Sequence, residues 1–404
     1  MLPRILFLAH RVPYPPDKGD RIRSYHLLRH LAARAKIHLG FLNEGDVPEP
    51  TRRKLDSLCE YVFVGNIPRL KRLRQGCMHL LAGKSITDGW FFSASFQAEI
   101  DRLLSANEYD AVFCYSSSTL QYVRGRGLDD QLITDLIDVD SEKWLDYSRR
   151  GGPLMSRVFH IECQRVREIE KRAAMSRAVL LTTEREAAVY RKYNPQANVH
   201  VVNNGIDLDY FTPQAGDEQQ GCIFVGYLDY HANVVGLQWF CQEIWPRLIE
   251  MHPDAKFRIV GRNPTRAVKA LGRVPGVGVV GPVADIRPLI ASTSVVVVPL
   301  PIARGIQNKI LEAMAMGKAV VSSQTALGGI SAQVGREIIG ADSPDEWVTQ
   351  IAGLWEDAER RRQIGLDARN FVESRHDWTR CLVPLTEAYD RLTNLRRSIP
   401  CQTA

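Results

Sequence analysis

SVVVVPLPIARGIQNKILEAMAMGKAVVSS, residues 294–323, holds a strand, a loop, a helix and a second strand in 30 residues. Four consecutive valines before Pro299 predict a strand that is buried on both faces, as in parallel sheets covered by helices. Residues 308–316 have helical spacing and end at Gly317, and residues 319–322 form another apolar run. The stretch therefore predicts a strand–helix–strand unit of an α/β sheet.

The same alternation of apolar runs and helical spacing extends along the chain. Strands that alternate with helices are typical of parallel sheets covered by helices. We therefore predict an α/β fold with two doubly wound, Rossmann-like domains. The other predicted strands are 4–9, 36–42, 61–64, 111–115, 132–137, 179–182, 199–202, 222–225, 256–260 and 277–280. The other predicted helices are 20–35, 154–176, 234–251, 285–291 and several between 344 and about 397.

A polar turn, Asn203-Asn204-Gly205, separates the two series of strands. A chain of 404 residues is long enough for two domains. We predict domains at 1–205 and 206–375, a further helical segment at 376–404, and a linker in the polar stretch 213–221. Ligands bind at the carboxyl ends of parallel strands, so the substrate is expected in a cleft where the two domains face each other.

The composition excludes several classes of protein. The formal net charge of +6 suits anionic ligands such as nucleotide diphosphates, or loose contact with an anionic membrane, but is too weak to indicate nucleic acid. Eight cysteines without a CxxC pair predict neither a disulfide framework nor a zinc site. No signal peptide is recognised, and no uncharged apolar stretch approaches the roughly 20 residues of a membrane span. We expect a cytoplasmic protein that at most lies on the cytoplasmic face of the inner membrane.

The loop and helix start within 304–312 carry the groups of an anion site. Gly305 allows a phosphate to approach the backbone, and the free N–H groups of a helix start bind anions. Arg304 and Lys309 add positive charge. Glu312 lies one turn into the helix, where its carboxylate can accept two hydrogen bonds from a ribose diol, and Asn308 shares its face. The alternative is a solvated Glu312 that pairs with Lys309 three positions away.

The run GIQNKILEAMAMGKAVV, residues 305–321, closely resembles the nucleotide-binding signature of glycosyltransferase family 4, whose members are retaining enzymes with the GT-B fold. Segments at 204–207, 224–230, 260–262 and 280–283 resemble further parts of the family's donor-binding domain, so the resemblance covers roughly residues 200–340. It implies a hexosyltransferase whose C-terminal domain binds a nucleotide diphosphate sugar and whose N-terminal domain binds the acceptor. It also implies that residues 376–404 pack back on the N-terminal domain.

The resemblance implies that Glu312 holds the donor ribose. The chain departs from the family pattern in two ways: Arg304 replaces the first of two paired glutamates, and Tyr227 and Ala232 stand where many members carry cations for the diphosphate. Our hypothesis is that Arg304 and Lys309, together with Arg262, supply the missing charge. No cofactor and no metal ion are expected. The predicted donor-binding residues are Gly226, Arg262, Arg304, Gly305, Ile306, Gln307, Asn308, Lys309 and Glu312.

The N-terminal half contains two further segments of interest. PYPPDKGDRIR, residues 13–23, resembles a variant of the family's glycine-rich first loop. Together with LIDVDSEKW, residues 136–144, it resembles sugar transferases associated with bacterial exopolysaccharide and exosortase (PEP-CTERM) loci. His10 ends the first predicted strand, and Gly19 and Asp20 begin the next helix, so all three are expected on the acceptor side. The alternative is that the prolines and glycine of this loop merely form a turn.

Asp138 and Asp140 end another predicted strand on the same side. Asp138 is our candidate catalytic residue, because a carboxylate there would steady an oxocarbenium-like charge or orient a hydroxyl. The alternative is a helix cap by Asp140 or Ser141, with Lys143 as an ion-pair partner. The DxD pattern also matches the metal site of single-domain glycosyltransferases, but two predicted domains argue against that interpretation. The GxGxxG match at 276–281 lies in a predicted strand and is dismissed.

The basic segment RLKRLR, residues 69–74, is a candidate for contact with anionic lipid headgroups, at about 1 kcal/mol for each cation. Leu70, Leu73, Leu80 and Leu81 would give its helix an apolar face. A plain solvated helix is the alternative. For the whole chain, two other functions fit the architecture: a sugar-nucleotide 2-epimerase, and a catalytically silent scaffold of the same fold.

Overall fold

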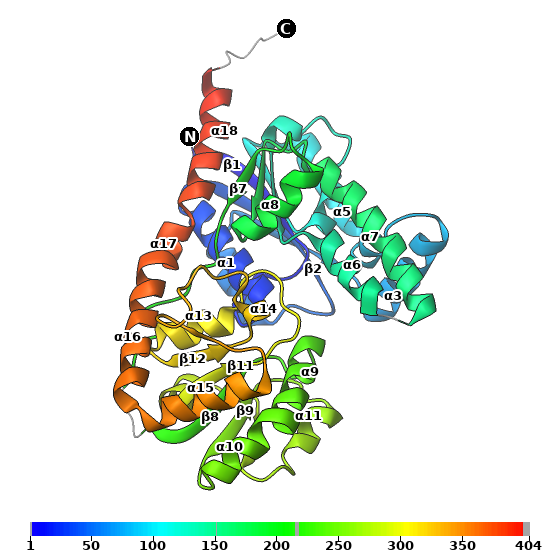
Figure 1. The fold of residues 1–404 in the computed structure, drawn as a ribbon. Coiled ribbons are helices and arrows are strands. Elements are labelled where there is room, and N and C mark those ends of the chain that lie inside the picture. Colours follow the sequence, from blue (N-terminus) through cyan, green and yellow to red (C-terminus); the bar gives the residue numbers. More distant parts are fainter. Residues whose placement is uncertain (1, 151, 215–217, 399–404) are drawn as a thin grey trace. The chain divides into compact units, whose positions relative to one another are not determined.

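The computed structural model describes residues 2–150, 152–214 and 218–398 (Figure 1). Its contacts divide the chain into two compact units. The first unit comprises the residues up to Val202 together with those from Leu382 onward, and the second unit is Asn203–Cys381. Each unit has its own parallel sheet, so the predicted α/β class with two Rossmann-like domains is confirmed.

In the described part of the first unit, seven parallel strands lie in the order β3-β2-β1-β4-β5-β6-β7. The strands are β1 (Arg4–Ala9), β2 (Lys36–Asn43), β3 (Tyr61–Asn66), β4 (Ala111–Tyr115), β5 (Leu132–Ile137), β6 (Ala178–Leu181) and β7 (Val199–Val201). The helices are α1 (Gly19–Ala32), α2 (Glu49–Asp56), α3 (Arg69–Leu81), α4 (Ile86–Trp90), α5 (Ala94–Ala106), η1 (Ser117–Tyr122), η2 (Asp129–Gln131), α6 (Asp140–Arg150), α7 (Pro153–Ala173), α8 (Glu184–Tyr193) and α18 (Val383–Ser398). Helix α18, red in Figure 1, joins this unit, and Thr386 shares a hydrogen bond of 2.7 Å with His30 of α1.

In the described part of the second unit, six parallel strands lie in the order β10-β9-β8-β11-β12-β13. The strands are β8 (Gln219–Val225), β9 (Lys256–Val260), β10 (Val277–Gly281), β11 (Thr293–Val298), β12 (Ala319–Ser322) and β13 (Ile339–Gly340). The helices are α9 (His231–Trp239), η3 (Phe240–Ile244), α10 (Trp245–Met251), α11 (Arg266–Leu271), α12 (Arg287–Ala291), α13 (Asn308–Ala315), α14 (Gln324–Leu327), α15 (Pro344–Glu356), α16 (Ala358–Arg375) and α17 (Trp378–Cys381). In both sheets the strand order reverses beside the unit's first strand, which creates a switch point between β1 and β4 and another between β8 and β11.

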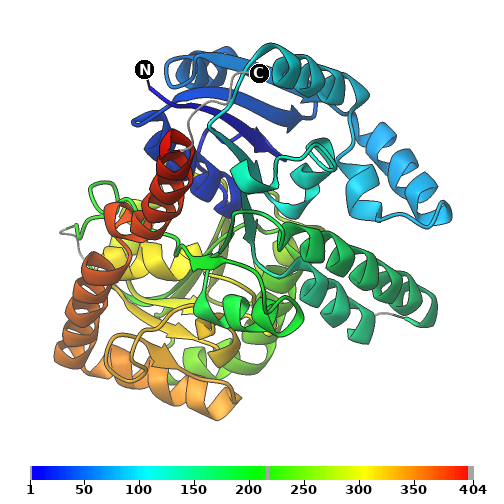
Figure 2. The ribbon, with the colours of Figure 1, turned by 90° about the horizontal axis from the view of Figure 1, so that it is seen from above.

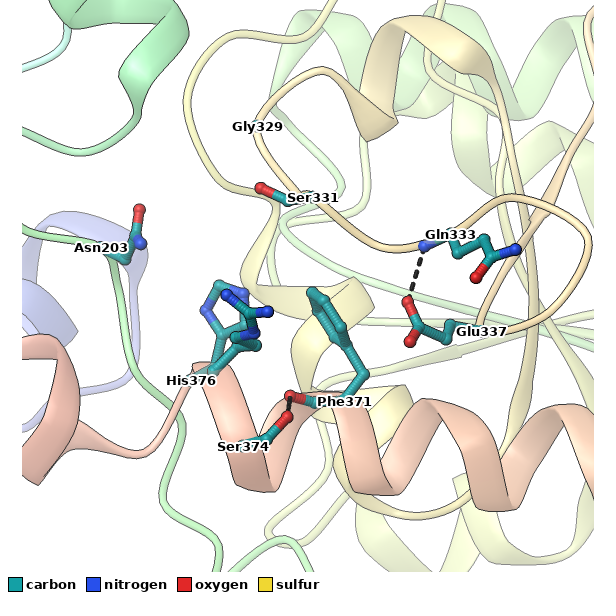
Figure 3. A pocket seen from close by; sticks show the side chains of 9 residues that line it. Asn203, Gly329, Ser331, Gln333, Glu337, Phe371, Ser374 and His376 are labelled. Carbon is teal, nitrogen blue, oxygen red and sulfur yellow. Dashed lines mark hydrogen bonds between the residues drawn. The ribbon is translucent and has the colours of Figure 1, made fainter.

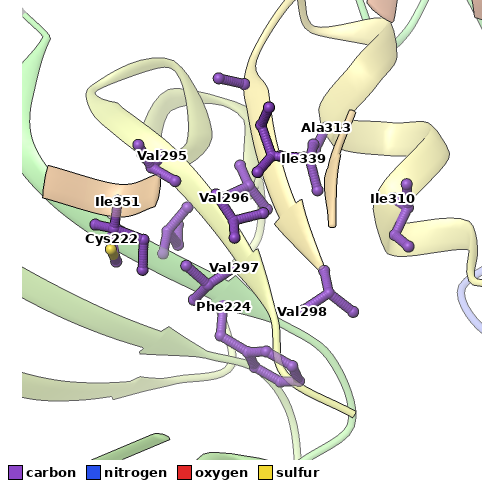
Figure 4. Close-up of a cluster of buried hydrophobic side chains, with 14 of the residues drawn as sticks. Cys222, Phe224, Val295, Val296, Val297, Val298, Ile310, Ala313, Ile339 and Ile351 are labelled. Carbon is purple, nitrogen blue, oxygen red and sulfur yellow. The ribbon is translucent and has the colours of Figure 1, made fainter. Parts of the chain in front are cut away.

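The valine run of β11 forms the centre of the second unit. Its four valines are at most 2% exposed, and Figure 4 shows them between side chains from β8, α13, β13 and α15. The strand is hydrogen-bonded to β8 on one side and to β12 on the other. This arrangement holds the end of β11, and the loop that follows it, in a fixed place beside the end of β8.

Two sequence predictions about the second unit are wrong in detail. The predicted helix 234–251 is interrupted by the π-helical turn η3, because Pro246 has no N–H and its ring would clash with the preceding turn of a regular helix. The predicted linker 213–221 ends too late, since Gln219–Val225 is strand β8 and Gly221 pairs with Lys256 of β9. Residues 215–217 of that stretch lie outside the described residues.

The core of the first unit contains one buried ion pair. Arg23 of α1 donates two hydrogen bonds to the carboxylate of Asp135 on β5, at 2.8 and 3.2 Å, and a third to the carbonyl oxygen of Val202 at 2.6 Å. The side chains of Arg23 and Asp135 are 1% and 0% exposed. The pair therefore joins α1, the middle of the sheet and the last residue of the unit's first segment.

Removal of one member of this pair is expected to destabilise the first unit strongly. Asp135→Ala leaves the Arg23 guanidinium buried without its counter-ion, which costs about 3–5 kcal/mol of unfolding free energy. Asp56→Ala is the matched control, because the Arg52–Asp56 pair is exposed and contributes less than about 1 kcal/mol. Urea denaturation followed by circular dichroism measures both variants, and equal effects would contradict the role given to the buried pair.

Candidate active site

Close backbone contacts join the ends of β8, β9 and β10, on one side of the second unit's switch point. Gly226 follows β8 and Gly261 follows β9, and a Cβ atom on Gly261 would overlap the carbonyl oxygen of Gly226. The N–H of Gly226 donates to the carbonyl of Val260 at 3.0 Å, and the N–H of Gly261 donates to that of Gly281 at 2.9 Å. Only glycine at position 261 allows the two loops to approach so closely. These contacts therefore fix the loop after β8 at the carboxyl edge of the sheet.

The loop between β11 and α13 reaches the same edge. Gly305 has a φ of 60°, and its carbonyl oxygen packs so closely on Gly329 that any side chain there would clash. Gln307 precedes α13, but its side chain donates to the carbonyl of Arg304 at 3.1 Å and does not cap the helix. Among the described residues no side chain caps α13, and the N–H groups of its first turn stay the predicted place for an anion.

Lys309 projects from the first turn of α13 toward the end of β8. Its ammonium nitrogen lies 2.8 Å from Oδ1 of Asn233 and 4.4 Å from the ring centroid of Phe224. Asn233 is buried and donates to the carbonyl of Tyr227 at 2.7 Å, which fixes its orientation. A Cβ atom on Gly226 would come within 3.1 Å of the ammonium group. The cation thus fills the space beside the loop after β8, where Tyr227 and Ala232 bring no charge.

Glu312 lies one turn further along α13 and is half-buried. Burial raises the pKa of its carboxyl to about 7, and the charge of Lys309 opposes this shift. Burial likewise lowers the pKa of the Lys309 ammonium to about 7, against the charge of Glu312. Glu312 is therefore not the fully solvated residue of the alternative interpretation, although it does interact with Lys309.

The remaining predicted donor-side residues have different surroundings. Asn308 accepts a hydrogen bond from the side chain of Asn204 at 3.3 Å, and its own Nδ2 is buried without a hydrogen-bond partner among the described residues. Ile306 and Arg304 are half-buried in the loop before α13. Arg262 is exposed in the loop after β9, where its carbonyl accepts from the N–H of Leu228 at 2.8 Å.

In the first unit, His10 and Asp20 lie together beside the end of β1. The two side chains are 3.8 Å apart, and Arg11 donates to Asp20 at 2.8 Å. Burial, aided by the charge of Arg11, lowers the pKa of His10 to about 4, so the imidazole is neutral at pH 7. Burial acts to raise the pKa of Asp20, but the charges of Arg11 and His10 bring it below its ordinary value. Gly19 is the first residue of α1.

Asp138 follows β5 at the same edge of the first sheet. Its Oδ1 accepts a hydrogen bond of 2.6 Å from Thr182. Burial, assisted by the nearby charge of Glu186, raises the pKa of Asp138 to about 6. Asp140 has other partners, with Lys143 at 3.4 Å and the Ser117 hydroxyl at 3.4 Å, so the ion pair of the alternative interpretation is present for Asp140.

Sequence reasoning missed Asn233, Thr182 and Glu186, the side chains that hold or perturb these groups. Asn233 directly follows Ala232, a position singled out for its lost cation, but no local pattern links it to a lysine 76 positions later.

The GxGxxG match at 276–281 includes β10, which confirms that it is not a strand-to-helix turn. Among the described residues, no helix is long and apolar enough to cross a membrane.

A pocket of roughly 400 Å³ lies next to the loop that contains Gly305, between the loop after α14 and the end of α16 (Figure 3). Glu337 accepts a hydrogen bond from the N–H of Gln333 at 2.6 Å, and Nδ1 of His376 lies 2.8 Å from the carbonyl oxygen of Asn204. The predicted site residues are not among those that line it, which are Asn203, Gly329, Ser331, Gln333, Glu337, Phe371, Ser374, Arg375 and His376. We assign the site to the strand ends, because Lys309, its partner Asn233 and Glu312 lie together there.

The chain resembles known proteins in sequence and in fold. Residues 219–357 match the family model described as glycosyl transferases group 1, a segment that begins with β8 and contains α13. An uncharacterized 44.6 kDa protein in the cps region of Klebsiella pneumoniae is 19% identical over 391 residues, which are 93% of this chain and 96% of that protein.

Two solved structures have the same fold. Sucrose-phosphate synthase from Thermosynechococcus elongatus superposes with a TM-score of 0.69 at 16% identity, over 97% of this chain and 100% of that one. HepE from Anabaena in complex with UDP superposes with a TM-score of 0.67 at 16% identity, over 96% of this chain and 100% of that one. The chain therefore has the GT-B fold, and residues 219–357 match the model of the glycosyl transferases group 1. The matched segment, about a third of the chain, carries Gly226, Lys309 and Glu312.

The raised pKa of Glu312 generates a prediction about stability. A group whose pKa is higher in the folded protein than in the unfolded chain contributes stability that is lost as the pH rises through the folded value. Glutamine has no such titration. The unfolding free energy of wild type relative to Glu312→Gln should therefore fall between pH 4.5 and pH 7 and then level off. Denaturation at several pH values measures this difference, and a pH-independent difference would show that Glu312 titrates normally.

Proposed function

We propose that this protein transfers a sugar from a nucleotide diphosphate sugar to a glycan or lipid-linked acceptor, with retention, as a member of glycosyltransferase family 4. The observation that carries the proposal is the cluster of Lys309, Glu312, Asn233 and Gly226 at the carboxyl edge of the second sheet. The relative in a cps region favours a role in exopolysaccharide biosynthesis, in line with the resemblance to transferases of exosortase loci. Solved structures of HepE with UDP and with UDP-glucose favour a uridine diphosphate sugar as donor.

The donor is held by three kinds of group in this proposal. The two carboxylate oxygens of Glu312 accept hydrogen bonds from the ribose diol. The diphosphate lies against the first turn of α13, where backbone N–H groups and the helix dipole attract negative charge. Lys309 and Arg304 supply the positive charge that the family's usual loop cations provide, so the proposal requires no metal ion. Each of these groups lies on, or directly before, one rigid helix that is packed against the centre of the sheet.

Catalysis then depends on position and charge, without a strong protein nucleophile. Negative charge develops on the leaving diphosphate, and the groups that bind it stabilise that charge in the transition state. The leaving phosphate itself helps to deprotonate the acceptor. Asp138, oriented by Thr182, is proposed to steady the positive charge on the transferred sugar or to orient a hydroxyl. His10, Gly19 and Asp20 are proposed to shape the acceptor side.

Donor affinity tests the nucleotide site. Lys309→Met, which keeps a side chain over the Phe224 ring, and Glu312→Ala are each expected to weaken nucleotide-sugar binding about 10- to 100-fold. Loss of one hydrogen bond to a charged group costs about 1.5–3 kcal/mol. Arg304→Ala is expected to weaken it about tenfold. Isothermal titration calorimetry, after a thermal-shift screen to find the donor, measures these constants.

The matched control for these variants is Lys269→Ala, which removes an exposed lysine from α11 of the same unit and should leave affinity unchanged. If Arg304→Ala and Lys309→Met both bind donor as tightly as wild type, the hypothesis of relocated charge fails. A wild-type protein that binds no nucleotide sugar at all would instead support the silent scaffold. Conversion of a nucleotide sugar in the absence of acceptor would identify the epimerase.

Turnover tests Asp138. Asp138→Asn is expected to lower kcat about 100-fold or more while the KM for the donor stays within about twofold, because the charge is needed only in the transition state. The activity of wild type should also decrease as the pH falls through about 6, where Asp138 takes up a proton. Asp140→Asn is the control, since it changes a neighbouring carboxylate that is paired with Lys143. Equal losses in the two variants would mean that neither carboxylate has a specific role.

A further inference from the structure

Helix α3 of the first unit presents its apolar side chains to solvent. Leu70, Leu73 and Leu81 are 83%, 56% and 88% exposed, and Cys77 between them is exposed as well. Residues spaced by three or four positions lie on one face of a helix, so these four form a single stripe. A surface helix normally turns such a stripe toward the core. In α3 the stripe points outward.

The opposite side of α3 shows why the helix cannot roll to bury these leucines. Arg72 is 7% exposed, donates to the carbonyl of Ile67 at 3.0 Å and lies 5.9 Å from the ring centroid of Phe91. Gly76, one turn later, is buried against Ile86 of α4. The sequence-based expectation that all four cations of residues 69–74 face a partner is therefore wrong for Arg72. Leu80 is half-buried and does not belong to the exposed stripe.

Positive charge accompanies the stripe. Arg69, Lys71 and Arg74 are exposed around it, Lys84 is exposed just beyond the helix, and α3 contains no acidic residue. We call Leu70, Leu73, Cys77 and Leu81 together with Arg69, Lys71 and Arg74 the α3 face. A partner that matches the α3 face must combine negative charge with an apolar layer just beneath it.

The helix is also held firmly in place. Arg165 of α7 donates to the carbonyl oxygens of Lys84 and Leu80, at 2.7 and 3.3 Å. Glu162 of α7 is buried and accepts from the hydroxyl of Ser85 and from the backbone and hydroxyl of Thr87. Figure 1 shows α3 and α7 in the same part of the first unit, and Figure 2 shows the light-blue α3 at the edge of that unit. The exposed leucines are therefore presented by a braced element.

We propose that the α3 face docks on an anionic lipid bilayer. The leucines enter the boundary between headgroups and acyl chains, and the three cations lie at the level of the anionic headgroups. A helix of 13 residues is too short to span the bilayer and lies in its plane. This docking deepens the proposed function, since it would bring the enzyme to a lipid-linked acceptor. It is measured without donor or acceptor, so its outcome does not depend on catalysis.

Vesicle co-sedimentation tests the proposal. Wild type should bind vesicles of equal parts phosphatidylglycerol and phosphatidylcholine, bind phosphatidylcholine alone far more weakly, and be released by salt. The triple variant Arg69→Gln, Lys71→Gln, Arg74→Gln should bind the anionic vesicles on the order of 100-fold more weakly, at about 1 kcal/mol for each cation. The triple variant Leu70→Ser, Leu73→Ser, Leu81→Ser should also lose binding, although its charge is unchanged.

Matched controls separate the α3 face from general surface properties. Arg172→Gln, Arg185→Gln, Lys192→Gln removes three other exposed cations of the first unit and should bind like wild type. Leu366→Ser removes a leucine of the second unit that is 60% exposed and should also bind like wild type. If the charge control loses as much binding as the α3 variant, the attraction is diffuse and the proposed docking face is wrong.

A probe on Cys77 reports insertion directly. Cys77 is exposed on the stripe, so an environment-sensitive fluorophore can be attached after Cys59 and Cys401 are changed to serine. Its emission should shift to the blue with anionic vesicles and become protected from an aqueous quencher. The same fluorophore on Leu366→Cys in a Cys77→Ser background should show neither effect. An unchanged spectrum at Cys77 would exclude insertion.

Other results would overturn the docking proposal or separate it from the proposed function. Wild type that self-associates in analytical ultracentrifugation, is monomeric in the leucine variant and does not bind vesicles would make the face an interface between copies of the chain. Leucine variants that bind vesicles as wild type does would also overturn the proposal. A wild type that docks on anionic vesicles but binds no nucleotide sugar would retain the docking face and reject the proposed function.

Discussion

The ammonium group of Lys309 is the interaction on which the candidate site depends. It lies over the ring of Phe224 and against Asn233, and Gly226 leaves the space that it occupies. Each partner belongs to the loop or helix after β8 or to that strand itself, whereas Lys309 comes from the helix after β11. The contact therefore joins the two strands on either side of the switch point, where ligands bind in folds of this kind. The proposed replacement of the missing loop cations by Lys309 rests on this contact.

The two half-buried carboxyl groups, Glu312 and Asp138, have pKa values that are shifted in the same direction by the same cause. Asp138 directly follows β5 and Glu312 lies on α13, and burial raises the pKa of each above its ordinary value. Functional sites often contain ionisable groups whose pKa values are shifted by their surroundings in the folded protein. A ribose diol that donates to Glu312 would stabilise the charged form and lower its pKa again. Ligand binding would thus supply hydrogen-bond donors to the Glu312 carboxylate.

The sequence predicts the sheets well and the side-chain contacts poorly, for definite physical reasons. Strands β1, β9 and β12 have the predicted bounds, because a short apolar run between polar turns can bury its side chains in few ways other than as a strand. The π turn at η3 and the early start of β8 depend on tertiary packing, which periodicity does not contain. The positions of Glu312 and Lys309 on α13 follow from helical spacing. Their partner Asn233 comes from another helix, and only the folded chain brings it there.

The same limit applies to α3, and it changes how the chain's net charge is interpreted. From composition alone, a formal charge of +6 is small and has no evident location. In the folded protein, α3 carries four basic residues and no acidic one, so most of the excess is concentrated on a single helix. Periodicity identifies that helix as amphipathic but does not reveal which side packs on the protein. The burial of Arg72 determines the orientation of the helix, because the side with Arg72 packs on the protein and the leucines remain exposed.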